Sequence, residues 1–501
     1  MGDQPSYLAL DFGAESGRAV LGRLEAGRLR LAEVHRFPNL PRRQGGTLRW
    51  DARGLFEELK LGLKRALEAS DGRLASVGVD TWGVDFALID AAGELLADPV
   101  HYRDERTRGI AERAFQIVPR ERIYELTGIQ FLPFNSLFQL LATKWSGPET
   151  LQAADRLLMM SDLFHFWLTG RAANEFTNAT TTQCYDPRGG DWAWPLLDSL
   201  DLPRRLFGEI AAPGTKLGPL RPDLARQWEA PSVEVLLPAT HDTASAVLAA
   251  PAESAAWAYI SCGTWSLLGA ETRAPRVTPA ALAANFTNEG GAFGTNRLLV
   301  NIMGLWLIQR LRADAARRGR TADYDELIAA AEAAPAFGAL VDPDDPAFLN
   351  PPEMAGAIDD ACRRTGQPPP TTEGGYVRCA LESLALKYRY RLEQLEGILG
   401  EPVEVLHLIG GGSRNAFLCR ATADACARPV LAGPAEATAL GNLLMQAFAH
   451  GEVADQSHLR AIVRESCPPR RYDPSEPDRW ETPYRRWVEL MGAGGGRGGV
   501  A

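Results

Sequence analysis

The fold is decided first by residues 7–22, which read YLALDFGAESGRAVLG. An apolar run, a polar turn with glycines and a second apolar run predict two strands joined by a turn. Gly13 and Gly17 permit positive φ and a close approach to the backbone, so the turn can direct N–H groups at an anion. Asp11, at the end of the first strand, could hold a hydrated Mg²⁺. A plain hairpin with a glycine turn is the alternative.

A second stretch of this kind lies near the middle of the chain, at residues 258–269, which read AYISCGTWSLLG. It again has an apolar strand, a glycine beside hydroxyl residues, and a second apolar strand. Two hairpins that begin equivalent halves of a chain indicate an internal duplication. Each half would then supply one turn to a phosphate ligand held between them.

The length of the chain and its breaks suggest how it divides. A chain of 501 residues is too long for one hydrophobic core, so two domains of roughly 200–250 residues are expected. Pro251, in a small polar cluster at residues 249–256, marks a linker. We therefore expect an α/β protein with domains at residues 1–248 and 249–490, followed by a glycine-rich, disordered tail at residues 491–501.

Composition narrows the class of partner. The formal net charge is −10 and no basic run is present, which argues against nucleic acid as a partner. The sequence has no signal-like N-terminus and no apolar run of 18 residues, so we expect a cytoplasmic protein without a membrane partner. Its seven cysteines include no C-x-x-C pair; Cys362 and Cys379 could be neighbours, but reduced thiols are the default.

Residues 236–247, which read LLPATHDTASAV, contain the polar cluster that best suits a catalytic site. An apolar run ends in proline and a Thr-His-Asp-Thr cluster before small residues resume at helical spacing, which predicts a strand-to-helix turn. Asp242 would then lie beside free N–H groups at a helix N-terminus, where it could meet a polar substrate. The alternative is that Asp242 only caps the helix.

Further polar turns have two interpretations each. Trp82, Gly83 and Asp85 combine an apolar surface, a tight approach and an acceptor, which suits a sugar pocket, but a second hairpin with a core tryptophan fits equally well. Asn301 would on the plain interpretation cap a helix, and Gln309 two turns later would face water.

Three adjacent glycines, residues 410–412, follow a buried strand and precede a helix. Adjacent glycines destabilise regular structure, so a backbone surface against a flat ligand explains them better than a plain turn does. The adenosine end of a nucleotide is the natural candidate, although the string is not the G-x-G-x-x-G dinucleotide pattern.

Taken together, these strings resemble the FGGY carbohydrate kinases of the actin-like ATPase superfamily, from the first hairpin to about Phe448. Besides the hairpins, the strings that carry the resemblance are residues 80–86 (DTWGVDF), 102–104 (YRD), 128–135 (GIQFLPFN), 177–182 (TNATTT), 241–246 (HDTASA) and 301–306 (NIMGLW). The resemblance implies two actin-like, ribonuclease H-like ATPase domains with a cleft between them.

The resemblance also implies a role for each matching residue. The ATP phosphates would be bound by Ala14, Glu15, Ser16, Gly17, Arg18 and Thr264, and the rest of the nucleotide by Gln309 and Gly411. The sugar would be bound by Gly83, His241, Asp242, Thr243 and Asn301. Asp242 would accept the proton and Asp11 would be the carboxylate associated with Mg²⁺. Glu15 departs from the family turn, where hydroxyl residues are commoner, and a carboxylate there would repel phosphate unless it points away or meets Mg²⁺.

The expected reaction follows from the same strings, which within the family resemble those of members acting on L-rhamnulose. We therefore expect transfer of phosphate from ATP to the C1 hydroxyl of L-rhamnulose, by a monomer or small homo-oligomer. Another FGGY ketose kinase, acting on L-fuculose or L-xylulose, is the first alternative. An actin-like ATPase without a sugar substrate is the second.

Overall fold

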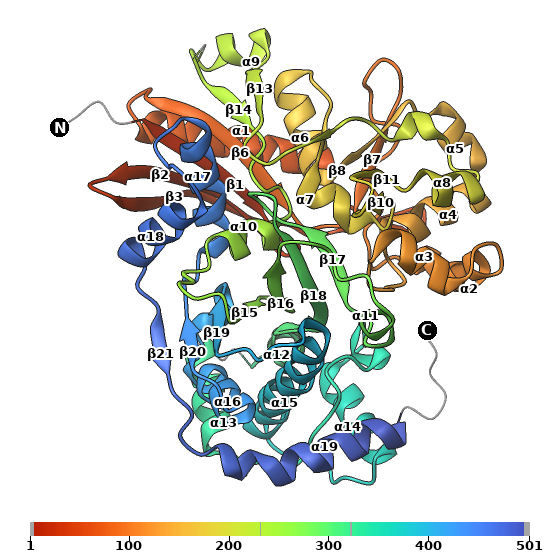
Figure 1. The fold of residues 1–501 in the computed structure, drawn as a ribbon, viewed down its shortest axis with the longest axis vertical. Helices are drawn as coiled ribbons and strands as arrows, with labels where there is room; N and C mark the ends of the chain where they lie inside the picture. Colours follow the sequence, from red (N-terminus) through yellow and green to blue (C-terminus); the bar gives the residue numbers. More distant parts are fainter. Residues whose placement is uncertain (1–4, 231, 321–322, 495–501) are drawn as a thin grey trace. The chain divides into compact units, whose positions relative to one another are not determined.

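The computed structural model describes residues 5–230, 232–320 and 323–494 (Figure 1). The chain forms two compact units. Unit 1 comprises Met1–Pro251, Glu271–Leu298 and Ala437–Cys467, and unit 2 comprises Ala252–Ala270, Leu299–Glu436 and Pro468–Ala501. Two segments beyond residue 248 thus join unit 1, and the domain boundaries expected from the sequence stay a prediction.

Unit 1 is built on a six-stranded sheet in the order β13-β14-β6-β1-β2-β3. Its strands are β1 (Ser6–Phe12), β2 (Ser16–Glu25), β3 (Arg28–Pro38), β6 (Leu74–Thr81), β13 (Lys216–Pro219) and β14 (Glu234–Leu236). β1 pairs antiparallel with β2 and parallel with β6, and β6 pairs parallel with β14. The predicted first hairpin is therefore confirmed.

Helices cover both faces of this sheet. The main helices of unit 1 are α1 (Ala52–Ala69), α4 (Ser136–Ser146), α6 (Met160–Thr169), α10 (Asp242–Leu248), α17 (Ala437–Ala449) and α18 (Gln456–Ser466). Gly62 of α1 lies against Leu10, whereas Gly78, which pairs with Ala9, lies against Asn442 of α17. Because successive residues of a strand point to opposite faces, α1 and α17 lie on opposite sides of the sheet.

Shorter elements complete unit 1. The strands are β4 (Arg42–Gln44), β5 (Thr47–Arg49), β7 (Phe86–Ile89), β8 (Arg156–Met159), β9 (Asn174–Glu175), β10 (Tyr185–Asp186), β11 (Asp191–Trp192), β12 (Ile210–Ala211) and β17 (Thr287–Gly290). The helices are α2 (Ile110–Phe115), α3 (Arg120–Thr127), α5 (Pro148–Ala153), α7 (Phe176–Ala179), α8 (Trp194–Ser199), α9 (Pro222–Gln227) and α11 (Pro279–Ala283). β7 pairs with β8 and not with β6. The turn at residues 82–85 therefore does not close a hairpin, and that interpretation of the sequence was wrong.

Unit 2 contains a sheet in which β18, β16, β15, β19, β20 and β21 follow one another. These strands are β15 (Trp257–Cys262), β16 (Trp265–Thr272), β18 (Asn296–Met303), β19 (Val405–Ile409), β20 (Val430–Ala432) and β21 (Arg470–Tyr472). Its helices are α12 (Trp306–Arg317), α13 (Tyr324–Ala333), α14 (Met354–Arg364), α15 (Glu373–Leu399), α16 (Ala416–Cys426) and α19 (Glu481–Gly494).

The two sheets repeat one topology, as the duplicated hairpins predict. In each unit a hairpin strand, β1 or β15, pairs antiparallel with the next strand and parallel with a later strand, β6 or β19. A second parallel strand follows, and then an antiparallel edge strand. The turn of each hairpin therefore lies at the same place in its own sheet.

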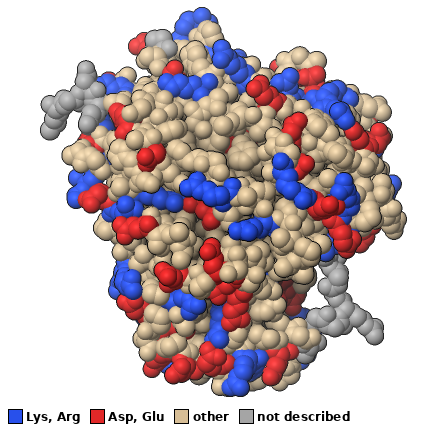
Figure 2. Space-filling view, in the orientation of Figure 1, with Lys and Arg blue, Asp and Glu red and all other residues tan. Residues whose placement is uncertain are grey.

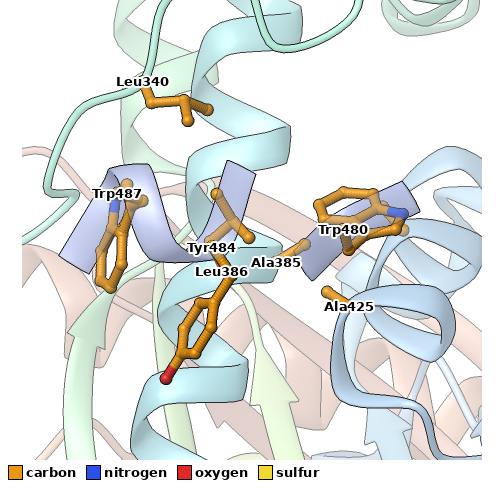
Figure 3. Close-up of a cluster of buried hydrophobic side chains, with 8 residues drawn as sticks. Leu340, Ala385, Leu386, Ala425, Trp480, Tyr484 and Trp487 are labelled. Carbon is orange, nitrogen blue, oxygen red and sulfur yellow. The ribbon is translucent and has the colours of Figure 1, made fainter. Parts of the chain in front are cut away.

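The C-terminal helix α19 is anchored in unit 2 by aromatic side chains. Trp480, Tyr484 and Trp487 join a buried cluster with residues of α15 and α16 (Figure 3). The indole Nε1 of Trp487 donates to the carbonyl of Val341 at 2.8 Å. The helix continues to Gly494, so the first residues of the segment expected to be a disordered tail are helical, whereas residues 495–501 lie outside the described residues.

The charge of the surface, the apolar character of the helices and the state of the cysteines can be compared with the expectations from the sequence. On the face shown in Figure 2, acidic and basic side chains are interspersed over the surface. Within the described residues, no helix is both long enough and apolar enough to cross a bilayer. The seven cysteines are all free thiols, and the Cys362 and Cys379 side chains are neighbours in a hydrogen bond.

Candidate active site

Asp242 is the first residue of α10, directly after the loop that follows β14. His241 is the N-cap residue, so the expectation that Asp242 serves as the cap was wrong, although Asp242 Oδ1 does accept from the backbone N–H of Thr243. The same oxygen accepts from Thr243 Oγ1 at 3.0 Å. Within the described residues no donor bonds to Oδ2, and 30% of the side chain is exposed. Oδ2 is thus the oxygen available to a substrate.

The surroundings of Asp242 make it a stronger base than an ordinary aspartate. Burial raises its pKa, the neighbouring His241 lowers it, and the negative charge of Asp11 raises it again, so that the pKa lies above the usual value. A hydroxyl proton is transferred more readily to a base with a raised pKa, provided the carboxylate is still ionised at the working pH.

Gly83 lies directly against this site. A Cβ atom on Gly83 would come within 3.3 Å of His241 Nε2 and within 3.1 Å of the Thr181 side chain. A side chain at residue 83 would therefore crowd the imidazole and Thr181. The structure brings together Gly83, His241, Asp242 and Thr243, four of the five residues expected to bind sugar.

Asp85, two residues further on, is not available to a ligand. Its carboxylate is fully buried and accepts from Trp50 Nε1 at 2.6 Å, Trp82 Nε1 at 3.0 Å and Gln139 Nε2 at 2.8 Å. Burial raises its pKa to about 6, against these hydrogen bonds. Asp85 therefore orients two indole rings and fixes the turn that carries Gly83.

Replacing Asp85 by asparagine tests this structural role. The new side-chain amide would turn a donor toward groups that already donate, so at least one buried hydrogen bond is lost. We expect Asp85→Asn to lower the free energy of unfolding by about 1–3 kcal/mol, measured by denaturant titration. Asp71→Asn is the matched control because the Asp71 side chain is 80% exposed. Equal stability of both variants would contradict the role.

Asp11 and Asp80 lie side by side on β1 and β6, where they are register partners. Asp11 forms an ion pair with Arg18 of β2 at 2.5 Å. Asp80 Oδ2 accepts from Asn442 Nδ2 at 2.6 Å, whereas the buried Oδ1 has no hydrogen-bond partner in the described part of the chain. Burial and the charge of Asp11 raise the pKa of Asp80 well above its usual range.

These carboxylates have the chemistry of a magnesium site. Mg²⁺ prefers oxygen ligands and is usually held by one or two carboxylates together with substrate phosphates. The unpartnered Asp80 Oδ1 beside Asp11 is an acceptor that a cation or its water could satisfy. Among the described residues, no three acidic, histidine or cysteine side chains form a metal-binding group by themselves.

The turn of the first hairpin, residues 13–15, is held by Asn39. The Asn39 amide donates to the Gly13 carbonyl at 2.8 Å, and its backbone N–H donates to the Glu15 carbonyl at 2.9 Å. Among the described residues, the backbone N–H of Ala14 has no hydrogen-bond partner, and the Glu15 side chain is exposed. A free N–H on a rigid turn is what an anion requires.

The glycines of the first hairpin do not adopt the backbone conformation expected of them. Neither Gly13 nor Gly17 adopts a positive φ. A Cβ atom on Gly17 would come within 2.1 Å of the Phe37 ring, so residue 17 is a glycine because the sheet packs tightly there. Positive φ was therefore the wrong reason for these glycines, whereas their close approach to an anion stays a prediction.

Unit 2 has the matching turn at Gly263 and Thr264. Gly263 N–H donates to the Trp265 carbonyl at 2.8 Å, as Gly13 N–H does to the Ser16 carbonyl at 3.0 Å. Within the described part of the chain, Thr264 N–H likewise has no partner. Each turn therefore exposes one backbone N–H without a partner in the described residues, although the turn of unit 2 is one residue shorter than that of unit 1.

The start of α12 packs on this second turn. Gly304 and Trp306 N–H donate to the Thr264 carbonyl at 3.1 and 3.2 Å. Gln309 lies one turn into the helix and is half-buried, and its buried Oε1 has no partner in the described residues, so the plain interpretation that it only faces water does not account for Oε1. Asn301 lies in β18, so the expectation that it caps a helix was also wrong.

The three glycines lie against the same hairpin of unit 2. Gly410 adopts a φ of +81°, and a Cβ atom on Gly412 would come within 2.3 Å of Cys262 Sγ. Gly411 is exposed, with open space where a side chain would stand. This loop therefore offers a bare backbone surface, as the sequence predicted for a flat ligand.

Comparisons with known proteins agree with this geometry. The N-terminal domain of the FGGY family of carbohydrate kinases matches residues 6–249, and the C-terminal domain of that family matches residues 258–450. The chain belongs to this family. It is an ATP-dependent carbohydrate kinase, as the resemblance of its sequence to this family implied.

Relatives and solved structures place this FGGY kinase further. It is 43% identical to a rhamnulokinase of Bacteroides thetaiotaomicron over 479 residues, which cover 96% of this chain and 98% of that protein. It is 40% identical to a rhamnulokinase of Bacillus subtilis over 475 residues, which cover 94% of this chain and 96% of that protein.

Solved structures of low identity share the fold of this kinase. A xylulose kinase of Lactobacillus acidophilus matches with a TM-score of 0.80 and 17% identity, covering 98% of this chain and 99% of that chain. A gluconate kinase of the same organism matches with a TM-score of 0.79 and 16% identity, covering 98% of both chains. These likenesses confirm the two-domain, actin-like α/β fold expected from the sequence.

Some residues of the site were missed at the sequence level. Glu289 and Arg297 pack behind His241, and Asn442 binds Asp80. Glu289 lies in a polar stretch that the sequence does show, but nothing local marks its partner. Asn442 comes from a helix more than 350 residues after Asp80, and only the fold brings the two together.

Proposed function

We propose that this FGGY kinase transfers the γ-phosphoryl group of ATP to the C1 hydroxyl of L-rhamnulose, giving L-rhamnulose 1-phosphate and ADP. The observation that carries the proposal is the partly exposed Asp242 carboxylate beside Gly83 and His241, whose Oδ2 accepts no hydrogen bond within the described residues while Thr243 holds Oδ1. The choice of L-rhamnulose is supported by the relatives named rhamnulokinase, which match this chain over almost its whole length.

The proton of the sugar hydroxyl goes to Asp242. A hydroxyl is a poor nucleophile at neutral pH, so a carboxylate must accept its proton as the phosphoryl group is transferred in line. Thr243 holds Oδ1 with two hydrogen bonds, which fixes the carboxylate and presents Oδ2 to the substrate. His241 and Gly83 form the wall beside it, and Asn301 of β18 is proposed as a further sugar contact.

The nucleotide is assigned to the two turns and the glycine loop. Residues 14–18 and Thr264 would bind the phosphates through backbone N–H groups, and Arg18 would add positive charge. Gln309 and Gly411 would lie along the rest of the nucleotide. Glu15 is exposed and would point away from the phosphates.

Asp11, with Asp80 beside it, would hold Mg²⁺. Mg²⁺ held there would supply positive charge that stabilises the charge developing on the transferred phosphoryl group. Because the substrates ATP and ketose are cytoplasmic metabolites, a cytoplasmic location belongs to the same proposal, together with a monomeric or small homo-oligomeric state.

The sugar preference is tested by ADP release with a panel of acceptors. We expect L-rhamnulose to give the highest kcat/KM, L-fuculose a lower value, and glycerol and D-gluconate values near background. L-rhamnulose ends in a methyl group, and a pocket that packs on this methyl leaves the terminal hydroxyl of other ketoses unpaired. A buried unpaired hydroxyl costs roughly 1–3 kcal/mol, about one or two decades in selectivity.

The panel also has an outcome against the proposal. If L-xylulose, glycerol or D-gluconate exceeded L-rhamnulose, the chain would still be an FGGY kinase but the proposed substrate would be wrong. ADP release that no sugar increases would contradict the assignment of Gly83, His241 and Asp242 to a sugar site.

A further inference from the structure

A buried ion pair stands behind the candidate site of unit 1. Arg297 of β18 and Glu289 of β17 approach each other to 3.1 Å, between Nη2 and Oε2. The Arg297 side chain has no exposed surface, and that of Glu289 is 6% exposed. Arg297 Nε also donates to the Gly290 carbonyl at 2.8 Å, which fixes the plane of the guanidinium. Neither residue has a role in the phosphoryl transfer proposed above.

Both residues of the pair face His241. Arg297 Nη2 forms a hydrogen bond with His241 Nδ1 at 3.1 Å. Glu289 Oε2 lies 3.3 Å from the same nitrogen. On the other edge of the ring, His241 Nε2 lies 3.5 Å from Asp242 Oδ1. The imidazole therefore bridges the buried ion pair and the candidate base.

The hydrogen bond from Arg297 decides where the imidazole carries its proton. A guanidinium does not lose its proton in proteins and can only donate, so the nitrogen it meets must accept. A neutral imidazole with an accepting Nδ1 carries its proton on Nε2. Consistent with this, no hydrogen bond joins Glu289 Oε2 to Nδ1 in the described residues, and the contact of Oε2 with Arg297 is an ion pair.

Glu289 balances the charge of the guanidinium. Burial by itself would raise the pKa of Glu289, but the positive charge of Arg297, together with the contacts that Glu289 makes with its neighbours, outweighs it, so the pKa is lowered and the carboxylate stays ionised. An unpaired guanidinium in this buried place would be costly, so the pair is held together.

We propose that Arg297, with its charge balanced by Glu289, is a positioning residue that keeps the His241 proton on Nε2, directed at Asp242 and the sugar. The assignment of the sugar to this place rests on the proposed function. His241 then acts as a hydrogen-bond donor on the substrate side, toward Asp242 Oδ1 or an oxygen of the sugar. Asp242 Oδ1 then faces only hydrogen-bond donors, namely Thr243 and the N–H of His241 Nε2. This leaves Oδ2 to receive the proton.

Removal of the guanidinium would move the His241 proton from Nε2 to Nδ1. Without Arg297, Nδ1 can take the proton and donate it to Glu289 at 3.3 Å. Nε2 would then present a lone pair toward the Asp242 carboxylate at 3.5 Å, and two acceptors would repel each other. The donor to the sugar would be lost and the carboxylate would move from its position.

The test is the tautomer of His241 in the full-length protein, measured by NMR with ¹⁵N-labelled histidine. The chain has only seven histidines, and the spectrum of His241→Gln identifies the signals of residue 241. In the unchanged protein at neutral pH we expect the proton on Nε2. In Arg297→Met, which keeps much of the side-chain length without a donor, we expect the proton on Nδ1.

Kinetics give the second measurement. Arg297→Met is expected to lower kcat about 10- to 100-fold, the effect of a misplaced catalytic group, and to leave the KM for ATP unchanged. Arg297→Lys, which keeps a charged donor, should recover part of kcat. Arg378→Met is the matched control because Arg378 forms a comparable ion pair with the buried Glu382, at 2.7 Å in unit 2, and this variant should change neither tautomer nor kcat.

The outcomes separate this proposal from the proposed function. A proton on Nδ1 of His241 in the unchanged protein would overturn the proposal, and that spectrum can be recorded even if Arg297→Met does not fold. A folded Arg297→Met protein with the original tautomer and full turnover would overturn it as well. If the tautomer is as expected but L-rhamnulose is not phosphorylated, only the proposed substrate fails.

Discussion

Asp242→Asn is expected to lower kcat with L-rhamnulose by about 100-fold or more, which is the usual effect of removing a general base. Asparagine has nearly the same volume, and its carbonyl oxygen can still accept from Thr243 as Oδ1 does. Only the proton acceptor at Oδ2 is lost, so the stability of the protein and its affinity for ATP should not change. Steady-state kinetics and calorimetry with ATP measure the two effects separately.

The pH profile supplies a second measurement for the same residue. Asp242 must be ionised to accept a proton, and burial raises its pKa above the usual value. As the pH falls, kcat/KM should therefore decline at a higher pH than an ordinary aspartate would cause, and Asp242→Asn should lack this decline. Asp323→Asn is a suitable control because Asp323 caps α13 in unit 2, and asparagine caps equally well. Near-normal turnover of Asp242→Asn would show that the residue only supports the start of α10.

Gly263→Val has the second-largest expected effect, on nucleotide affinity. A Cβ atom on Gly263 would meet nothing closer than the Trp265 carbonyl at 3.8 Å, so the protein itself tolerates it. A phosphate that lies on the turn would not tolerate it. Loss of one hydrogen bond to a charged group costs roughly 1.5–3 kcal/mol, which corresponds to about a 10- to 100-fold weaker affinity for ATP.

Calorimetry with ATP and separately with the sugar tests this prediction. Gly338→Val is the matched control because a Cβ atom there would also lie 3.8 Å from the nearest carbonyl, in a turn of the same unit. Gly13→Val should act like Gly263→Val if both turns bind the nucleotide, although the Ser16 carbonyl at 3.3 Å leaves less room there. Normal ATP affinity of either variant would remove that turn from the nucleotide site.

Much of the fold follows from local patterns that a single sequence displays. The two hairpins at residues 7–22 and 258–269 predicted a duplication, and both units repeat one strand order around them. The Thr-His-Asp-Thr cluster predicted the strand-to-helix turn that holds Asp242. Such features depend on residues near one another in the chain, where apolar periodicity and glycine are informative.

The errors have identifiable physical causes. Residues 300–307 are almost uniformly apolar, and periodicity cannot separate a buried strand from a helix over so short a run, so Asn301 was placed at a helix start and not in β18. Residue 17 is a glycine because the ring of Phe37, on the neighbouring strand, leaves no room for a side chain. No local pattern in the sequence shows this contact.

Partners from distant segments could not be predicted either. Arg297 has no feature in its neighbourhood that would connect it with His241, 56 residues earlier in the chain. Asp85 looked like a ligand for a sugar because the sequence shows a carboxylate beside a glycine, whereas Trp50 and Gln139 already occupy it. Whether a polar side chain is free or satisfied depends on tertiary structure, and this distinction separates a binding residue from a structural one.

The central claim, transfer of phosphate to the C1 hydroxyl of L-rhamnulose, is tested most directly by NMR of the product formed from L-rhamnulose and ATP. The account predicts one equivalent of ADP for each sugar phosphate, with phosphorus coupled to C1. Phosphate on another carbon, or ADP and free phosphate without a sugar phosphate, would contradict it.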